Sequence, residues 1–259
     1  MKNVLITGGS SGIGLAIAEL LIESGEYRVI SLSRSADKIQ RAYRSHPHLE
    51  GKIDFVTGDV SREKDCINLL GYLEKHYQAL HALVNNAGYL TKGTIETISM
   101  GQWQQTMEVN LSGPFRLTKV LLPLLKKAGE ASVINISSIA AIRPGTSVAY
   151  SVSKAGLDML TQFLAGDLGP YGIRVNSINP GLVRTNLHRD NKIFTDDDAY
   201  EQMVENARER YPLGRIGEPR DIAELAAFLM SEKASWVTGA ILMADGGTNV
   251  FNELIPPKK

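Results

Sequence analysis

The sequence predicts an α/β fold, a doubly wound and mostly parallel sheet of about seven strands with helices on both faces. Short runs rich in β-branched residues alternate with longer amphipathic patterns, an order typical of βαβ units. Several runs are apolar almost throughout, as expected for strands that are buried on both faces. No low-complexity linker or break in composition divides the 259 residues, so we expect a single domain over 1–259.

The first half of the predicted sheet can be followed along the chain in order. "NVLITG" is a short apolar run typical of a buried strand, and "GIGLAIAELLIESG" has apolar residues at helical spacing until Gly25 ends the pattern. The alternation then repeats twice, with strands at 27–33, 52–59 and 81–88 and helices at 36–46 and 62–77.

The second half continues the pattern with one interruption. Further strands are predicted at 132–138, 172–181 and 240–247, with helices between them. The least regular segment is "VRTNLHRDNKIFTDDD", which begins at Val183, directly after a predicted strand. Because it is polar and rich in turn residues, we expect a substrate lid inserted near 183–210.

The composition argues against several classes of function. Lys plus Arg and Asp plus Glu both number 28, so no overall charge favours nucleic acid or an anionic membrane. The single cysteine, Cys66, suits a reducing compartment, and the N-terminal apolar run is too short for a signal peptide, which together predict a cytoplasmic protein. The five histidines are scattered, and His46 and His48 are expected to be solvated, so no metal site is predicted.

The segment "TGGSSGIG", which begins at Thr7, has the character of a phosphate-binding turn. It follows the first strand and opens the first helix, where glycines allow close approach of an anion and the helix offers free N–H groups. The spacing departs from strict G-x-G-x-x-G, and an ordinary glycine-rich turn is the alternative. The strand–turn–helix context nevertheless favours a dinucleotide in a Rossmann-like sheet.

The end of the second strand favours NADP(H) over NAD(H). A carboxylate here would bond the ribose 2′-hydroxyl of NAD, but the sequence reads "SLSRS", with Ser33, Arg34 and no acid before Asp37. A guanidinium can bind a 2′-phosphate by charge-assisted hydrogen bonds. A solvated arginine at a strand end is the alternative.

Tyr150 and Lys154, in "AYSVSKAG", are four residues apart and would share one face of a helix. Alone, the pair favours an exposed polar stripe over a catalytic role. In the context of the whole chain, the sequence resembles the short-chain dehydrogenase/reductase family over essentially its full length. The motifs that carry the resemblance are "TGGSSGIG", "GDV" at 58–60, "NNAG" at 85–88, the asparagine of "MEVNLSG", "NISS" at 135–138, "YSVSK" at 150–154 and "NPGLVRT" at 179–185.

The resemblance implies an oxidoreductase that moves a hydride between a nicotinamide and a small carbonyl or secondary alcohol. Tyr150 would be the general acid, Lys154 would lower its pKa, and Ser138 would donate to the substrate oxygen. Asn110 would hold a water that links Lys154 to solvent. Ser138 lies one residue closer to Tyr150 than is common in the family, and Ser137 would restore the common spacing. Only one of the two serines can face the site.

The resemblance also implies a cofactor site along the carboxyl edge of the sheet. Besides Tyr150 and Lys154, its residues would be Gly8, Ser10, Ser11, Gly12, Ile13, Gly14, Ser33, Arg34, Asp59, Val60, Asn86, Ala87, Gly88, Pro180, Gly181, Val183 and Thr185.

The substrate is not named by the sequence. We expect an apolar lid of Leu187, Ile193, Phe194 and Met203 over a floor of Tyr89, Leu90, Ile142 and Arg143. The C-terminal region resembles both sugar dehydrogenases and 3-oxoacyl-carrier-protein reductases of the family, and the carrier-protein reading is an alternative. A non-catalytic dinucleotide-sensing regulator is another alternative, but all four catalytic positions are retained.

Assembly is predicted from two predicted helical regions, 101–129 and 153–169. Both carry more apolar residues at three- and four-residue spacing than one face packed on a sheet requires. By resemblance, these helices would pair across a two-fold axis in a homotetramer or homodimer, and the last strand and its neighbouring helix would form a second interface.

Overall fold

Seven parallel strands form a single sheet in the order β3-β2-β1-β4-β5-β6-β7. The computed structural model describes residues 1–191, 193 and 196–250. The chain winds outward from β1 in one direction and then returns to continue from β4 in the other, so the expected doubly wound α/β fold is confirmed. The strands are β1 (Lys2–Thr7), β2 (Tyr27–Ser33), β3 (Ile53–Thr57), β4 (Ala82–Asn85), β5 (Ala131–Ile136), β6 (Ile173–Pro180) and β7 (Ile241–Ala244).

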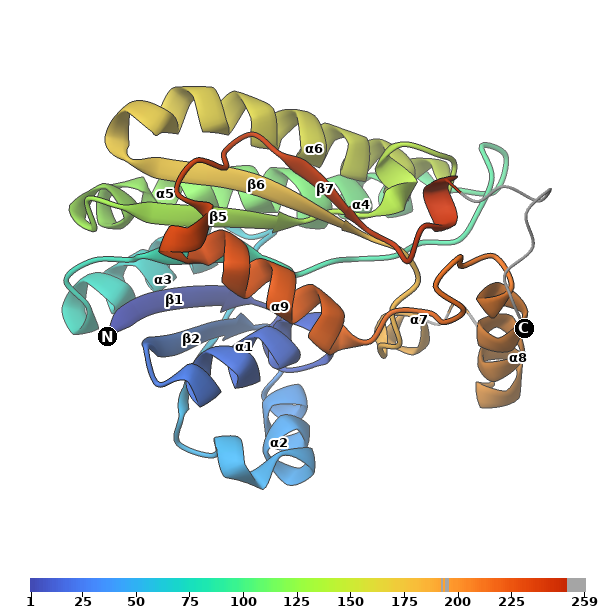
Figure 1. Cartoon of the computed structure of the whole chain (residues 1–259), viewed down its shortest axis with the longest axis horizontal. Coiled ribbons are helices and arrows are strands. Elements are labelled where there is room, and N and C mark those ends of the chain that lie inside the picture. Colours follow the sequence, from blue (N-terminus) through green and yellow to red (C-terminus); the bar gives the residue numbers. More distant parts are fainter. Residues whose placement is uncertain (192, 194–195, 251–259) are drawn as a thin grey trace.

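Helices cover both faces of the sheet (Figure 1). Successive strand residues point to opposite faces, so Val4 and Ile6 of β1 pack with α1 and α9, whereas Leu5 packs with α3 and α5. Both cores therefore share the same strands. The helices are α1 (Gly12–Ser24), α2 (Ala36–Ser45), α3 (Glu63–His76), α4 (Met100–Met107), α5 (Gly113–Lys127), α6 (Val148–Leu168), α7 (Leu187–Asp190), α8 (Asp197–Arg208) and α9 (Pro219–Met230).

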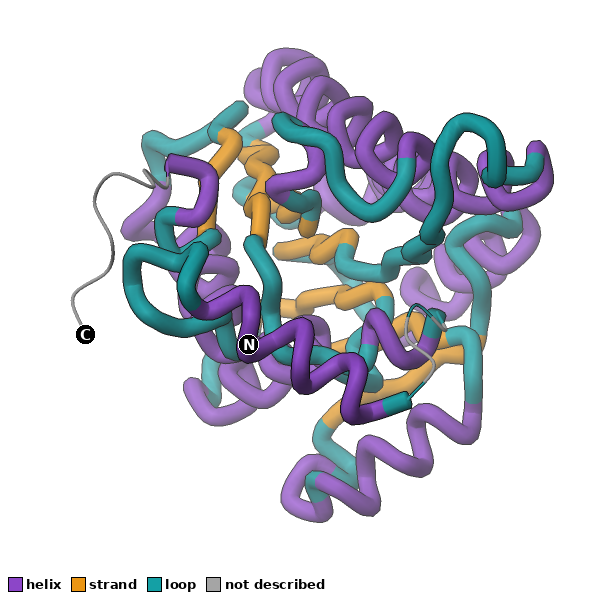
Figure 2. The backbone as a smooth tube through the Cα atoms, turned by 90° about the vertical axis from the view of Figure 1, so that its right-hand side faces the viewer, coloured by secondary structure: helices purple, strands orange, loops and turns teal. Residues whose placement is uncertain are grey.

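All the strands end at the same edge of the sheet because they run in parallel. Figure 2 looks toward this edge, with the loops (teal) in front of the strands (orange). Helices α7 and α8 follow β6 and lie at the same side of the molecule (Figure 1). Within the described part of the chain, no helix combines the length and the apolar character needed to cross a bilayer.

A buried polar ladder joins the centre of the sheet to helix α6. Asn85 of β4 donates from Nδ2 to Oδ1 of Asn135 on β5 at 2.8 Å, and Asn135 donates to the Thr161 hydroxyl on α6 at 2.8 Å. All three side chains are buried. Because buried polar groups are costly without partners, this ladder fixes the position of α6 over β5.

We predict that Asn135→Ala lowers the free energy of unfolding by about 2–3 kcal/mol, since the Asn85 amide and the Thr161 hydroxyl each lose a buried partner. Urea denaturation measures the effect. Asn206→Ala is the matched control, because Asn206 is exposed on α8 and forms an exposed polar pair with Gln202; its effect should stay below about 0.5 kcal/mol. Equal effects of the two substitutions would contradict the structural importance of the ladder.

Candidate active site

A cleft of about 840 Å³ lies at the carboxyl edge of the sheet and gathers most of the residues that the sequence predicts for the site. Of the residues predicted for catalysis or cofactor binding, Asn110 and Gly14 do not line it directly. The predicted residues that line it are Gly8, Ser10, Ser11, Gly12, Ile13, Ser33, Arg34, Asp59, Val60, Asn86, Ala87, Gly88, Ser138, Tyr150, Lys154, Pro180, Gly181, Val183 and Thr185.

The glycine-rich turn forms an open cradle at the start of α1. Gly8 and Gly12 have φ angles of +70° and +54°, which other residues rarely adopt. Gly14 packs so tightly that a Cβ atom would lie 2.5 Å from both the Gly8 carbonyl oxygen and Nδ2 of Asn86. The side chain of Ser11 does not cap α1, so the first N–H groups of the helix are available to an anion. The cradle therefore fits the diphosphate of a dinucleotide.

The end of β2 lies on the adenine side of the predicted cofactor path. Ser33 is buried and its hydroxyl lies 3.2 Å from that of Ser31, whereas the half-exposed Arg34 guanidinium extends to 3.9 Å from Oδ2 of Asp59. Lys38 on α2 lines the same part of the cleft and forms an ion pair with Asp190 on α7. Lys38 is not predicted from the sequence, because its partner is 152 positions away.

Tyr150 and Lys154 both lie in the first two turns of α6 and both are buried. The Ser147 side chain caps the helix by accepting a hydrogen bond from the Tyr150 N–H group at 3.2 Å. The Lys154 ammonium donates to the carbonyl oxygen of Ile136, at the end of β5, at 2.8 Å. Helix α6 is therefore tied to the sheet at the point where the cleft opens.

Burial sets the acidity of this pair. Burial raises the pKa of Tyr150, while the Ser138 hydroxyl acts to lower it. Burial lowers the pKa of Lys154 to about 8, and the negative charge of Asp158 opposes this shift. The Lys154 ammonium lies 5.7 Å from the centre of the Tyr150 ring and donates to a backbone carbonyl. The lowering of the phenol pKa that the sequence predicts from Lys154 stays a prediction.

The two adjacent serines after β5 face different ways. Ser137 is buried and its hydroxyl donates to the Lys154 carbonyl oxygen at 3.2 Å. Ser138 lines the cleft, accepts a hydrogen bond from the Ala140 N–H group at 3.1 Å and lies within reach of the Tyr150 phenol. Of the two, Ser138 thus occupies the position from which a hydroxyl can meet a substrate oxygen beside Tyr150.

Asn110 lies behind the cleft in a π-helical turn, Glu108–Ser112, between α4 and α5. Its side chain brackets the backbone of Tyr89, accepting from the N–H group at 2.8 Å and donating to the carbonyl oxygen at 2.9 Å. It also donates to the Ser153 hydroxyl, next to Lys154, at 3.1 Å. Asn110 thus connects the loop after β4 with α6, and the water relay assigned to it stays a prediction.

The end of the cleft around Tyr150 has an apolar wall and a basic rim. Leu90 and Ala140 pack with Tyr150, and Leu187 and Ile193 lie against them. Met203 also lines the cleft, as do the arginines Arg143 and Arg210.

The expected floor is only partly formed, and Phe194 of the expected lid lies outside the described residues. Leu90 and Arg143 line the cleft, but Tyr89 packs against the core on the α3 and α5 face, and Ile142 is half exposed outside the cleft lining.

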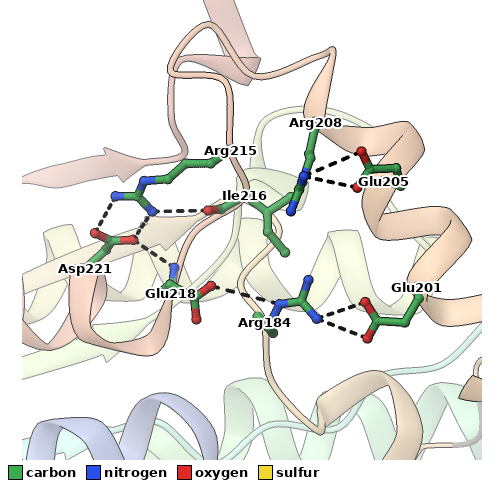
Figure 3. Close-up of polar contacts among 8 residues, drawn as sticks. All are labelled: Arg184, Glu201, Glu205, Arg208, Arg215, Ile216, Glu218 and Asp221. Carbon is green, nitrogen blue, oxygen red and sulfur yellow. Dashed lines mark hydrogen bonds and ion pairs between the residues drawn. The ribbon is translucent and has the colours of Figure 1, made fainter.

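Ion pairs hold α8 against the loop that leaves β6 (Figure 3). Arg184 contacts both carboxylate oxygens of Glu201 on α8 at 3.0 Å, and its Nε lies 3.9 Å from Glu218 at the start of α9. Arg215 makes a two-point contact with Asp221 of α9 at 2.6 and 2.8 Å. Exposed pairs contribute little to stability individually, so we assign the Arg184–Glu201 pair to orienting α8 beside the cleft, whereas Arg215–Asp221 joins the segment before α9 to that helix.

Metal-binding side chains do not gather anywhere in residues 1–191, 193 and 196–250, where no group of three His, Cys, Asp or Glu could hold an ion. Cys66 is buried, and burial raises the pKa of its thiol to about 11, so it is held as an unreactive thiol.

Comparison with known proteins extends over nearly the whole chain. A family model described as enoyl-(acyl carrier protein) reductase matches residues 8–249. L-xylulose reductase of Caenorhabditis elegans is 36% identical over 248 residues, covering 95% of this chain and 95% of its own. The NADP-dependent (R)-specific alcohol dehydrogenase of Lentilactobacillus kefiri is 34% identical over 250 residues, covering 95% of this chain and 96% of its own.

Comparison with solved structures also finds a dehydrogenase. The ligand-free structure of aldohexose dehydrogenase from Thermoplasma acidophilum superposes with a TM-score of 0.86 and 33% identity, covering 99% of this chain and 97% of the other. Family members use NAD(P), and the relatives are named for reactions of alcohols, sugars or their carbonyl forms. The chain belongs to the short-chain dehydrogenase/reductase family and is an oxidoreductase that acts on alcohol or carbonyl groups.

Proposed function

We propose that this enzyme transfers a hydride between NADP(H) and a small-molecule carbonyl or secondary alcohol, with Tyr150 as general acid and base. One observation carries the proposal: the Tyr150 phenol lines the cleft beside the Ser138 hydroxyl, with Lys154 one helical turn away. The glycine cradle at Gly12 opens into the same cleft. Proton donor, hydroxyl donor and dinucleotide cradle therefore share one space.

The proposed mechanism assigns each side chain one task. When bound in the cleft, the nicotinamide would supply or accept the hydride at the substrate carbon. In reduction, Tyr150 gives its phenolic proton to the oxygen that becomes the alcohol, and Ser138 donates a hydrogen bond to the same oxygen. The phenolate left on Tyr150 regains a proton from solvent, and the charge of Lys154 stabilises it in the meantime. Oxidation of an alcohol follows the same steps in reverse.

The preference for NADP(H) rests on two cations at the adenine end. Arg34 is half exposed, and Lys38 lies in the same part of the cleft. Together they would surround a 2′-phosphate, which Asp59 alone would repel. The remaining cofactor contacts are assigned to the cradle, to Val60 and Asn86–Gly88, and to the segment that contains Pro180, Gly181, Val183 and Thr185.

The end of the cleft beside Tyr150 favours a substrate with an apolar body, and it has room for an anionic group on that substrate. Leu90, Ala140 and Leu187 form an apolar wall beside Tyr150, and Arg143 and Arg210 supply positive charge. A 3-oxoacyl-carrier-protein substrate is the second candidate, favoured by the same arginines because carrier proteins are acidic. A dinucleotide sensor is the third candidate. Such a sensor requires neither the buried Lys154 nor the general acid Tyr150.

Cellular context and architecture follow from this assignment. We propose a cytoplasmic enzyme, which the reduced and buried Cys66 supports. Residues 1–259 are proposed to form one domain, in which α7 and α8 belong to the substrate lid near 183–210.

The function is tested by turnover. A panel of neutral ketones, sugars and oxo acids is assayed in both directions with both cofactors. Tyr150→Phe should lower kcat by roughly 10²–10⁴-fold, because only the proton donor is lost, while NADPH affinity stays within a few-fold. Tyr171→Phe makes the same change at an exposed site beyond the end of α6 and should leave kcat unaltered. Full activity in Tyr150→Phe would remove Tyr150 from the acid role.

Cofactor preference is tested separately. We predict that Arg34→Gln raises the KM for NADPH about tenfold and leaves the KM for NADH unaltered, because the 2′-phosphate loses a charged partner remote from the reacting carbon. Arg41→Gln, on the exposed side of α2 and outside the cleft lining, is the control and should change neither value. A wild-type enzyme that uses NADH better than NADPH would overturn the preference.

We further propose a homotetramer. Phe115 of α5 and Met159 and Phe163 of α6 are exposed apolar residues, as are Phe228 of α9 and Trp236, which precedes the edge strand β7. Light scattering should give about four times the chain mass of 28.3 kDa. Phe163→Glu should yield dimers, and the double variant Phe163→Glu/Trp236→Glu should yield monomers. Ile95→Glu, at an exposed loop site, is the control, and an active wild-type sample with the mass of one chain would exclude the assembly.

A further inference from the structure

Behind the proposed catalytic pair lies a buried carboxylate to which the mechanism above gives no task. Asp158 follows Lys154 by one turn of α6, so the two side chains share one face of the helix. Asp158 is only 9% exposed, and Lys154 4%. A carboxylate at this depth is costly unless it is paired or hydrogen-bonded, so its presence needs an explanation.

Two strand side chains hold the Asp158 carboxylate in a fixed orientation. Ser177 lies 2.9 Å from Oδ1, and the Asn179 amide donates to Oδ2 at 2.6 Å. Both residues are on β6 and both are fully buried. Neither carries a charge, so these contacts satisfy the carboxylate without neutralising it. The negative charge thus remains available to Lys154.

The charged groups on neighbouring elements do not compete for this role. The elements packed against this part of α6 are β5, β6, α4, the π-helical turn and the 3-10 turn Ile139–Ala141. They carry two ionisable side chains. Glu108 pairs with Arg116, and Arg174 donates to backbone carbonyls at the far end of the sheet. On α6 itself, Tyr150 and Asp158 are the groups that face Lys154.

We propose that Asp158 is a positioning residue for Lys154, an inference that rests on the proposed function. Its buried charge keeps the ammonium protonated and oriented toward the end of β5, and its hydrogen bonds join α6 to the end of β6. Asn179 directly precedes Pro180 and Gly181, which line the cleft. Asp158 thereby couples the helix that carries the proton donor to the loop assigned to the nicotinamide.

The direction of the electrostatic effect is fixed by the charges. Burial alone disfavours the ammonium, and the Asp158 carboxylate favours it, so Lys154 retains a pKa of about 8. Removal of the carboxylate should therefore lower the pKa of Lys154 further. Lys154 would then lose its charge at a lower pH, and the high-pH decline of kcat/KM in reduction would move to lower pH in parallel.

The test combines a titration and a pH profile on the full-length enzyme. ¹³C-labelled lysine side chains are titrated by NMR without substrate, and Lys154→Arg assigns the signal. Asp158→Asn should lower the pKa of Lys154 by about one unit and shift the decline of kcat/KM by the same amount. Asp158→Glu keeps the charge and should restore most of both values.

Two controls separate charge from structure. Ser177→Ala removes a hydrogen bond to Asp158 but leaves its charge, and should lower the melting temperature without shifting the Lys154 pKa. Asp167→Asn makes the same charge change at an exposed site of α6. If Asp158→Asn prevents folding, because its new amide faces that of Asn179, Asp158→Ser carries the same test.

The outcomes distinguish the two proposals. A Lys154 pKa in the Asp158 variant equal to that in Asp167→Asn overturns the inference, even where Tyr150-dependent turnover stands. A lowered Lys154 pKa in an enzyme that turns over no carbonyl or alcohol supports the electrostatic coupling while the proposed function fails, because the titration needs no substrate.

Discussion

The hydrogen bond from the Lys154 ammonium to the Ile136 carbonyl is the contact on which the geometry of the site depends. Ile136 is the last residue of β5, a central strand between β4 and β6. By holding Lys154 there, the structure fixes the angle at which α6 meets the sheet, and Tyr150 follows because it lies one turn earlier. Ser138, two residues beyond Ile136, then reaches the phenol. Strand end, serine, tyrosine and lysine are thus positioned by one another.

A layer of uncharged polar side chains makes this arrangement rigid. Asn85 and Asn135 link β4 to β5, and Asn135 continues to Thr161 on α6. On the other side, Ser177 and Asn179 of β6 hold Asp158. Hydrogen bonds in a buried environment are directional and costly to leave unmade, so they specify one placement of the helix where apolar contacts alone would allow several.

The sequence is informative where local rules decide the structure and silent where distant groups meet. The β-branched runs located all seven strands, and the glycines that begin at Gly8 located the cradle, because both depend on backbone preferences within a few residues. The orientations of Ser138 and Asn110 depend instead on a 3-10 turn after β5 and on a π-helical turn, neither of which has a reliable sequence signature. Lys38 meets Asp190 only in the folded chain, because the two residues are 152 positions apart. The one sequence signal for Asp158 is that it follows Lys154 by one helical turn.

The buried lysine also shows that the site is built at the expense of stability. The pKa of Lys154 falls from its ordinary value of 10.5 to about 8 on folding, so the unfolded chain binds more protons between these pH values. The penalty is fully present below pH 8, at about 3 kcal/mol, and is relieved as the pH rises from about 8 toward 10.5. At neutral pH the cofactor-free fold thus holds a charge that it would be more stable without. A catalytic purpose accounts for such a residue better than a structural one, because an apolar side chain of the same length would fill the space between α6 and β5 without this penalty.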